Sequence, residues 1–152
     1  MQTFLPFADF KKSAACLDML RLGKQRVEAL QILQTLLSFQ RMSSASWAHH
    51  PAVLMWRKHE IALCDYGLII CDEWFSRGYR DTVHSQILTL QNFLLEQPQR
   101  SRDLPSWLGN EKFHSSHRSN LLRKAPEWYG RFGWTEGPDQ AYFWPVRYEK
   151  AL

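Results

Sequence analysis

The sequence has few of the cysteines that stabilise small secreted domains. It contains three, Cys16, Cys64 and Cys71, and no CxxC pair. Three thiols cannot all pair within one chain, and Cys64 and Cys71 lie seven residues apart among apolar side chains. We therefore expect reduced, buried thiols in a reducing compartment. A nucleophilic cysteine stays open as the alternative.

The sequence also lacks segments that direct a chain to a membrane. No stretch approaches the roughly 20 apolar residues that a membrane-spanning helix needs. The first residues, MQTFLPFADFKK, have no basic start followed by an apolar run. We therefore expect a water-soluble, cytoplasmic protein without a membrane partner.

The short motifs of several enzyme classes are missing too. There is no Walker-type loop, no GxGxxG and no GxSxG elbow, which argues against nucleotide-driven and hydrolase-triad chemistry. HExxH and a compact His/Asp set are absent, and zinc needs about four ligands of defined geometry. We therefore predict no metal and no cofactor, although His114 and His117, spaced i, i+3, could share a ligand.

What the chain does contain is apolar and aromatic side chains at helical spacing. Hydrophobic residues make up 45% of the 152 residues and aromatic residues 14%, which is enough for one domain over 1–152 with its own core. Apolar residues recur every three or four positions in segments bounded by capping and helix-ending residues. The pattern predicts helices over about 10–39, 51–78, 82–96 and 111–124.

The residues between these segments favour irregular structure. Pro6 makes 1–8 extended or coil, and 41–49 is a serine-rich loop. Asp9, Pro51 and Thr82 suit helix starts, and Gly78 suits a helix end. The predicted fold is all-α, a compact single domain of about four helices with an irregular, aromatic-rich C-terminal tail.

Basic residues are in modest excess, and one group of them lies in the first predicted helix. The net charge is +4 and the pI about 9.1, which suits a polyanion partner. In RLGKQRVEAL, four polar side chains share one helix face: Arg21, Lys24, Gln25 and Glu28. Arg26 falls on the apolar stripe instead, so it needs a partner or a cleft, because an unpaired buried charge is costly. The alternative is a solvated polar face with Arg26 extending out of the core.

Two further segments carry candidates for nucleic-acid contact. His59 lies on one helical line with Trp56 and Leu63, where it could equally be a core histidine. Cations and aromatic rings alternate near the C-terminus, in the set His117, Arg118, Arg123, Lys124, Trp128, Tyr129 and Arg131. Cations neutralise phosphates and flat rings stack on unpaired bases. The alternative is a basic helix face followed by aromatic residues that close the core.

Three of these segments together resemble the pyrimidine-dimer DNA glycosylase family, of the endonuclease V type. LDMLRLGKQRVEAL resembles the first-helix segment of that family. HPAVLMWRKHEIALCDYGLIICDEWFSRGYRDT resembles its second helix, with a His-Pro start, a Trp-x-x-His step and a closing Arg-Gly-aromatic. LLRKAPEWYGRFGW resembles its Pro-x-Trp-Tyr motif followed by glycine.

The resemblance implies a glycosylase and abasic-site lyase acting on damaged or modified duplex DNA, without a cofactor. In the family the α-amine of the chain attacks the sugar C1′, a glutamate of the first helix assists, and arginines hold phosphates. Carried over, these roles fall to Met1, Glu28 and Arg26, and we expect a monomer. Two positions depart from the pattern: Gln2 should hinder removal of Met1, and Val27 stands where the glutamate is expected, one residue before Glu28.

Two other functions fit the same residues. One is a non-catalytic nucleic-acid-binding module that keeps the scaffold and has lost the chemistry. The other is a small-molecule enzyme that uses a His/Arg/Glu cluster in a pocket between the first two helices. All catalytic expectations require the start of the chain to fold back beside the polar face of the first helix.

Overall fold

The computed structural model describes residues 1–37 and 48–147, and these residues form an all-α structure without strands. The predicted fold class is therefore confirmed. The number of helices, predicted as about four, was wrong, because the described part holds seven α-helices and one 3-10 turn. They are α1 (Phe10–Cys16), α2 (Met19–Leu37), α3 (Pro51–Leu54), α4 (Glu60–Ser76), α5 (His84–Leu95), α6 (Glu111–Lys124), α7 (Pro126–Tyr129) and η2 (Gly130–Phe132).

Two of the predicted helices are each interrupted once. The first is divided into α1 and α2 because Leu17 is extended, with ψ 138°. The second is divided into α3 and α4 by residues 55–59, where Lys58 has a positive φ of 70°. His59 therefore lies in a connection and not on the helical line predicted for it.

The remaining boundaries are closer to the prediction. Helix α6 has the predicted bounds, with the Asn110 side chain accepting a hydrogen bond from the Lys112 amide at 3.0 Å. Gly78 ends α4 with φ 92°, as predicted. Helix α5 begins at His84, where Asp81 and not the predicted Thr82 accepts hydrogen bonds from the first amides. Most of the predicted loop over 41–49, and tail residues 148–152, lie outside the described residues.

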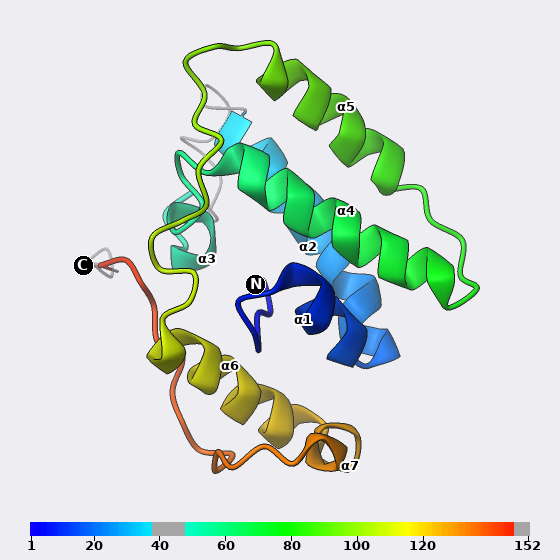
Figure 1. Cartoon of the computed structure of the whole chain (residues 1–152), viewed down its shortest axis with the longest axis vertical. Helices are drawn as coiled ribbons and strands as arrows, with labels where there is room; N and C mark the ends of the chain where they lie inside the picture. Colours follow the sequence, from blue (N-terminus) through cyan, green and yellow to red (C-terminus); the bar gives the residue numbers. More distant parts are fainter. Residues whose placement is uncertain (38–47, 148–152) are drawn as a thin grey trace.

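The helices form two groups with the start of the chain between them (Figure 1). Helices α1 and α5 pack against α4, which packs against α2, and α6 with α7 lies on the other side of the N-terminal segment. At Gly67 of α4, an added Cβ would come within 2.7 Å of Ile87 Cδ1 of α5, so glycine permits this close packing. Residues 2–6 are not helical, as predicted, and are buried.

The three cysteines are free and buried, as predicted. Burial raises the pKa of each thiol to about 12. A thiol with this pKa is protonated at neutral pH, and the thiolate is the nucleophilic form. Nothing about these three sites therefore favours a nucleophilic cysteine.

None of the described helices is both long enough and apolar enough to cross a membrane.

Candidate functional site

The first residues of the chain are fixed in place by buried side chains from two helices. Gln25 of α2 accepts a hydrogen bond from the Phe4 amide at 2.8 Å and donates one to the Gln2 carbonyl at 2.9 Å. From the opposite side, two histidines of α6 hold the Leu5 residue: His117 Nδ1 accepts from its amide at 2.9 Å, and His114 Nδ1 lies 2.8 Å from its carbonyl. The start of the chain is thus pinned between α2 and α6.

These contacts define which ring nitrogen of each histidine carries the proton. His114 Nε2 accepts from the Gly109 amide at 2.9 Å, so its Nδ1 carries the proton that is donated to the Leu5 carbonyl. His117 Nδ1 is an acceptor, so its proton lies on Nε2. Burial lowers the pKa of His114, and burial together with the charge of His114 lowers that of His117 to about 3. Both rings are neutral at physiological pH.

Glu28 lies beside the start of the chain. Its Oε2 accepts a hydrogen bond from Gln25 Nε2 at 2.9 Å and lies 3.5 Å from the Gln2 amide nitrogen. Met1 is partly buried, and the positive charge of its amine is the second cause, after burial, that lowers the pKa of His50. The chain start at Gln2 and Phe4 therefore lies against the polar face of α2 beside Glu28, as expected.

Cations from α2 and α6 lie near one another around Lys124. After burial, the causes that lower the pKa of Lys124 are the charges of Arg21, Arg123 and Lys24, and Glu28 opposes them. Four of the predicted nucleic-acid contacts, from two helices far apart in the sequence, therefore lie within electrostatic range of one another. We call Arg21, Lys24, Arg123 and Lys124 the cation cluster.

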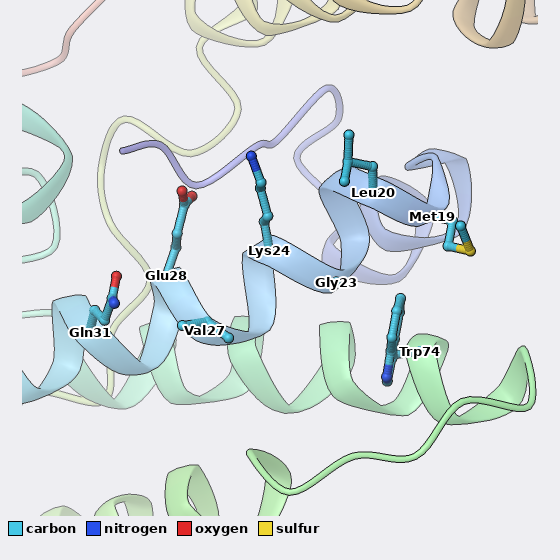
Figure 2. Close-up of a pocket in the computed structure, with 8 residues that line it drawn as sticks. All are labelled: Met19, Leu20, Gly23, Lys24, Val27, Glu28, Gln31 and Trp74. Atoms are coloured by element: carbon cyan, nitrogen blue, oxygen red, sulfur yellow. The ribbon is translucent and has the colours of Figure 1, made fainter.

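An open hollow of about 550 Å³ lies on the outer face of α2 beside Glu28 (Figure 2). Lys24 and Glu28 point to the same side of α2, and Trp74 of α4 forms the wall below Gly23 (Figure 2). A Cβ at Gly23 would come within 3.1 Å of the Trp74 ring. The residues that line the hollow are Met19, Leu20, Gly23, Lys24, Val27, Glu28, Gln31 and Trp74. Its volume is in the range of ligand-binding pockets, about 300–1,000 Å³.

Arg26 points away from this group. It lies two residues before Glu28, about 200° around the helix. Arg26 Nη1 is paired with Asp81 Oδ1 at 2.6 Å, and its Cζ lies 4.4 Å from the Trp74 ring centroid. Burial raises the pKa of Asp81, but hydrogen bonds from Arg26 and from two backbone amides outweigh it, and the pKa is lowered overall. The geometry favours a structural role for Arg26, which joins α2 to the start of α5.

We predict that Arg26→Ala clearly lowers the melting temperature and has little effect on DNA affinity. The side chains of Arg26 and Asp81 are 14% and 5% exposed, and removing one partner of a buried pair costs about 3–5 kcal/mol. Thermal unfolding of Arg26→Ala measures this effect, with Lys24→Ala as the exposed control. An unchanged melting temperature with lost DNA binding would show that Arg26 is a DNA clamp instead.

Three predicted DNA contacts lie in the interior. Gln25 is 1% exposed, and His117 and Tyr129 are 0% exposed. The Tyr129 hydroxyl donates to Asp18 and accepts from the Asp18 amide, so it positions the start of α2. These side chains were predicted to face DNA because their spacing places them near cations, whereas their polar groups bind the protein.

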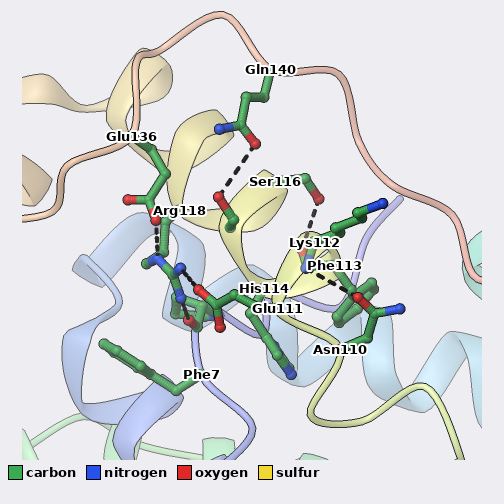
Figure 3. Close-up of polar contacts among 12 residues, drawn as sticks. Phe7, Asn110, Glu111, Lys112, Phe113, His114, Ser116, Arg118, Glu136 and Gln140 are labelled. Carbon is green, nitrogen blue, oxygen red and sulfur yellow. Dashed lines mark hydrogen bonds and ion pairs between the residues drawn. The ribbon is translucent and has the colours of Figure 1, made fainter.

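Arg118, also a predicted DNA contact, is used within the protein (Figure 3). Its guanidinium binds Glu136 at 2.6 Å, Glu111, and the Pro6 carbonyl at 2.8 Å. Two carboxylates neutralise its charge. Arg118 therefore ties α6 to the N-terminal segment and to the tail.

The other candidates lie at the surface or in connections. Arg131 is exposed and stacks over Trp128 at 4.1 Å, and Trp128 Nε1 donates to the Cys16 carbonyl at 2.8 Å. His59 Nδ1 lies 3.3 Å from the Asp103 carbonyl. Arg131 is thus accessible to solvent, and Trp128 is partly buried against α1.

No pattern in the sequence indicated that His114 and His50 are neighbours of the chain start. The i, i+3 spacing of His114 and His117 suggested a shared ligand, whereas both histidines hydrogen-bond to the Leu5 backbone. Within the described residues, no group of three or more His, Cys, Asp or Glu side chains is placed to hold a metal ion.

Comparison with known proteins identifies the family. The model of the pyrimidine dimer DNA glycosylase family matches residues 1–86, more than half of the 152-residue chain. No curated protein and no solved structure matches the chain. The matched part contains the start of the chain, all of α2 with Glu28, and α4 with Trp74. The chain therefore belongs to the pyrimidine dimer DNA glycosylase family, whose substrate is DNA.

Proposed function

We propose that the protein is a DNA glycosylase and abasic-site lyase that acts on a damaged or modified base in duplex DNA through the α-amine of Met1. The observation that carries the proposal is the position of Glu28 beside the start of the chain, 3.5 Å from the Gln2 amide nitrogen. An α-amine is partly uncharged near neutral pH and is then nucleophilic. A carboxylate within reach can take up and return protons.

In the proposed reaction the amine nitrogen forms a bond to the sugar C1′ while the glycosidic bond from C1′ to the base breaks. The base leaves with the electron pair and takes up a proton. Glu28 removes a proton from the attacking amine and delivers it to the ring oxygen O4′, and cleavage of the C1′–O4′ bond then gives a protonated imine. The Glu28 carboxylate then takes a proton from C2′, and the electron pair of that C–H bond expels the 3′-phosphate, which is the lyase step.

In this proposal the cation cluster binds the DNA phosphates, and the hollow receives the nucleotide that is displaced from the duplex. Lys124 lies within electrostatic range of Arg21, Lys24, Arg123 and Glu28, so phosphates bound to the cation cluster would hold the sugar near the start of the chain. Moving a nucleotide out of the duplex costs a few kcal/mol, and least at damaged positions. The hollow shares Lys24 and Glu28 with the proposed active site.

Borohydride trapping on a duplex with one abasic site tests the proposal. We expect a covalent complex whose DNA adduct maps to the N-terminal peptide, and intact mass that shows Met1 at the terminus. The control carries a two-residue N-terminal extension, which displaces the amine by roughly 7 Å and should abolish trapping. Equal trapping by the extended chain would overturn the assignment of the nucleophile.

The cation cluster on its own also supports a second candidate, a non-catalytic DNA-binding module. Its log affinity falls with log salt by a slope of about −0.9 for each phosphate neutralised. Salt-dependent binding by a folded protein that gives no trapped complex would favour this module over the lyase.

A further inference from the structure

We infer that Gln25 is the positioning residue that sets the distance between the start of the chain and Glu28. The inference rests on the proposed function, because it takes Met1 and Glu28 as the reacting pair. Its basis is the hydrogen bonding of one buried side-chain amide.

The orientation of this amide is fixed by its neighbours. The Phe4 N–H can only donate and the Gln2 carbonyl can only accept. Gln25 Oε1 faces the first at 2.8 Å and Gln25 Nε2 faces the second at 2.9 Å. A flipped amide would place donor against donor and acceptor against acceptor, so only one orientation satisfies both backbone groups.

The same orientation directs the second donor of the amide to Glu28. Gln25 Nε2 donates to Glu28 Oε2 at 2.9 Å, and Oε1 also accepts from the Tyr66 hydroxyl at 2.7 Å. One nitrogen thus bridges the Gln2 carbonyl and the Glu28 carboxylate. Because Gln25 is 1% exposed, water does not replace these bonds.

This bridge has a consequence for the reaction. Glu28 is only 3 positions along α2 from Gln25, but Gln2 is 23 positions away in the sequence, so the Gln25 amide joins the helix to the N-terminal segment. Without the Gln25 amide, Glu28 keeps its place on α2, but Met1 and Gln2 are no longer held at a fixed position relative to Glu28. The effect should fall on the chemical step and leave DNA binding, which uses the cation cluster, nearly intact.

The test compares Gln25→Met with wild type in single-turnover trapping on abasic duplex DNA. Methionine has a similar length and no amide, and a misplacement of about 1 Å can cost 10²-fold in rate. We expect the rate at saturating DNA to fall by at least about tenfold while Kd changes less than about threefold. Ser116→Ala, which also removes a buried hydrogen bond, to the Phe113 carbonyl, should leave the rate unchanged. A fall in both rate and affinity, or equal rate losses in both variants, would overturn the inference.

Amide hydrogen exchange gives a readout that does not depend on activity. The Phe4 amide donates to Gln25, whereas the Leu5 amide donates to His117. In Gln25→Met we expect faster exchange at Phe4 with protection kept at Leu5, and an unchanged Phe4 amide would overturn the inference. If Gln25→Met is unfolded by circular dichroism, Gln25→Asn, which keeps the amide but cannot span both partners, takes its place with the same expectations.

Failure of the proposed function and failure of the inference about Gln25 give different results. Absence of trapping in the wild-type protein removes the proposed function whatever the exchange result. Normal trapping in wild type and in Gln25→Met removes the inference alone.

Discussion

Replacement of Glu28 by glutamine is expected to reduce the rate of imine trapping by on the order of 10²–10⁴-fold, the range for loss of a general acid–base group. The amide keeps the size of the side chain but cannot take a proton from the amine. Single-turnover trapping at saturating abasic duplex DNA measures the rate. Affinity should change little, because phosphate binding is assigned in the proposed function to the cation cluster and not to Glu28.

Glu127→Gln is the matched control, since Glu127 is an exposed carboxylate on α7 and its loss changes the net charge equally. We expect wild-type rates for this variant. If Glu28→Gln traps DNA as fast as Glu127→Gln, Glu28 is not the acid–base group. In the family the glutamate is expected at the position of Val27, whose exposed side chain lines the hollow one position before Glu28. The experiment also decides whether Glu28 takes over the role of that glutamate.

The parts of the fold that sequence analysis found are those defined by local signals. Helix α6 has a capping Asn110 at its start and the Ala125-Pro126 step at its end, and both act within a few residues. The polar face of α2 was also found, and the predicted neighbours Gln25 and Glu28 are hydrogen-bonded. Spacing along one helix is sufficient for such contacts.

The break between α1 and α2 depends instead on contacts that no local pattern contains. Arg77 donates to the carbonyls of Leu17 and Ala15 at 2.8 and 3.2 Å, which satisfies the end of α1 from about 60 residues away. Tyr129 binds Asp18 at the start of α2. Within residues 10–39 the helical spacing of apolar residues is continuous, so the sequence of this segment alone predicts one long helix.

The candidate site divides in the same way. Glu28 and the four cations were predicted from spacing and resemblance, and their roles at a DNA site stay predictions. Gln25, His117 and Tyr129 were wrongly assigned to a DNA surface. Their burial comes from the N-terminal segment and the tail, which pack over α2 and α6, and the residues next to them in the sequence do not reveal it. A polar residue beside cations has the same sequence pattern whether it faces solvent or a second segment of chain.

The stability of the protein is expected to fall as the pH is lowered from about 6.5 towards 3, and His117 is the main cause. Its pKa is lowered from 6.5 to about 3. Between these values the unfolded chain takes up a proton that the folded protein does not, so this contribution to stability is complete above 6.5 and is lost by on the order of 1 kcal/mol for each pH unit below it. The lowered pKa of His114 acts in the same direction.

Packing around His117 accounts for the resistance to protonation. The ring is fully buried against Phe4, Phe113 and Tyr142, and His114 is the titratable neighbour that affects it. Glu111 and Arg118 act on His114, one raising and the other lowering its pKa. A proton on His117 Nδ1 would also displace the Leu5 amide, so protonation and docking of the chain start exclude each other.

Urea unfolding between pH 4 and 8 measures this dependence in wild type and in His117→Asn, whose side-chain oxygen can still accept from the Leu5 amide but does not titrate. We expect the variant to be less stable at pH 8 because asparagine leaves a cavity, and to lose less stability than wild type on acidification. Parallel pH profiles for the two proteins would show that His117 is not the titrating group. Because the same residue holds the start of the chain in place, trapping activity should fall together with stability in wild type as the pH drops.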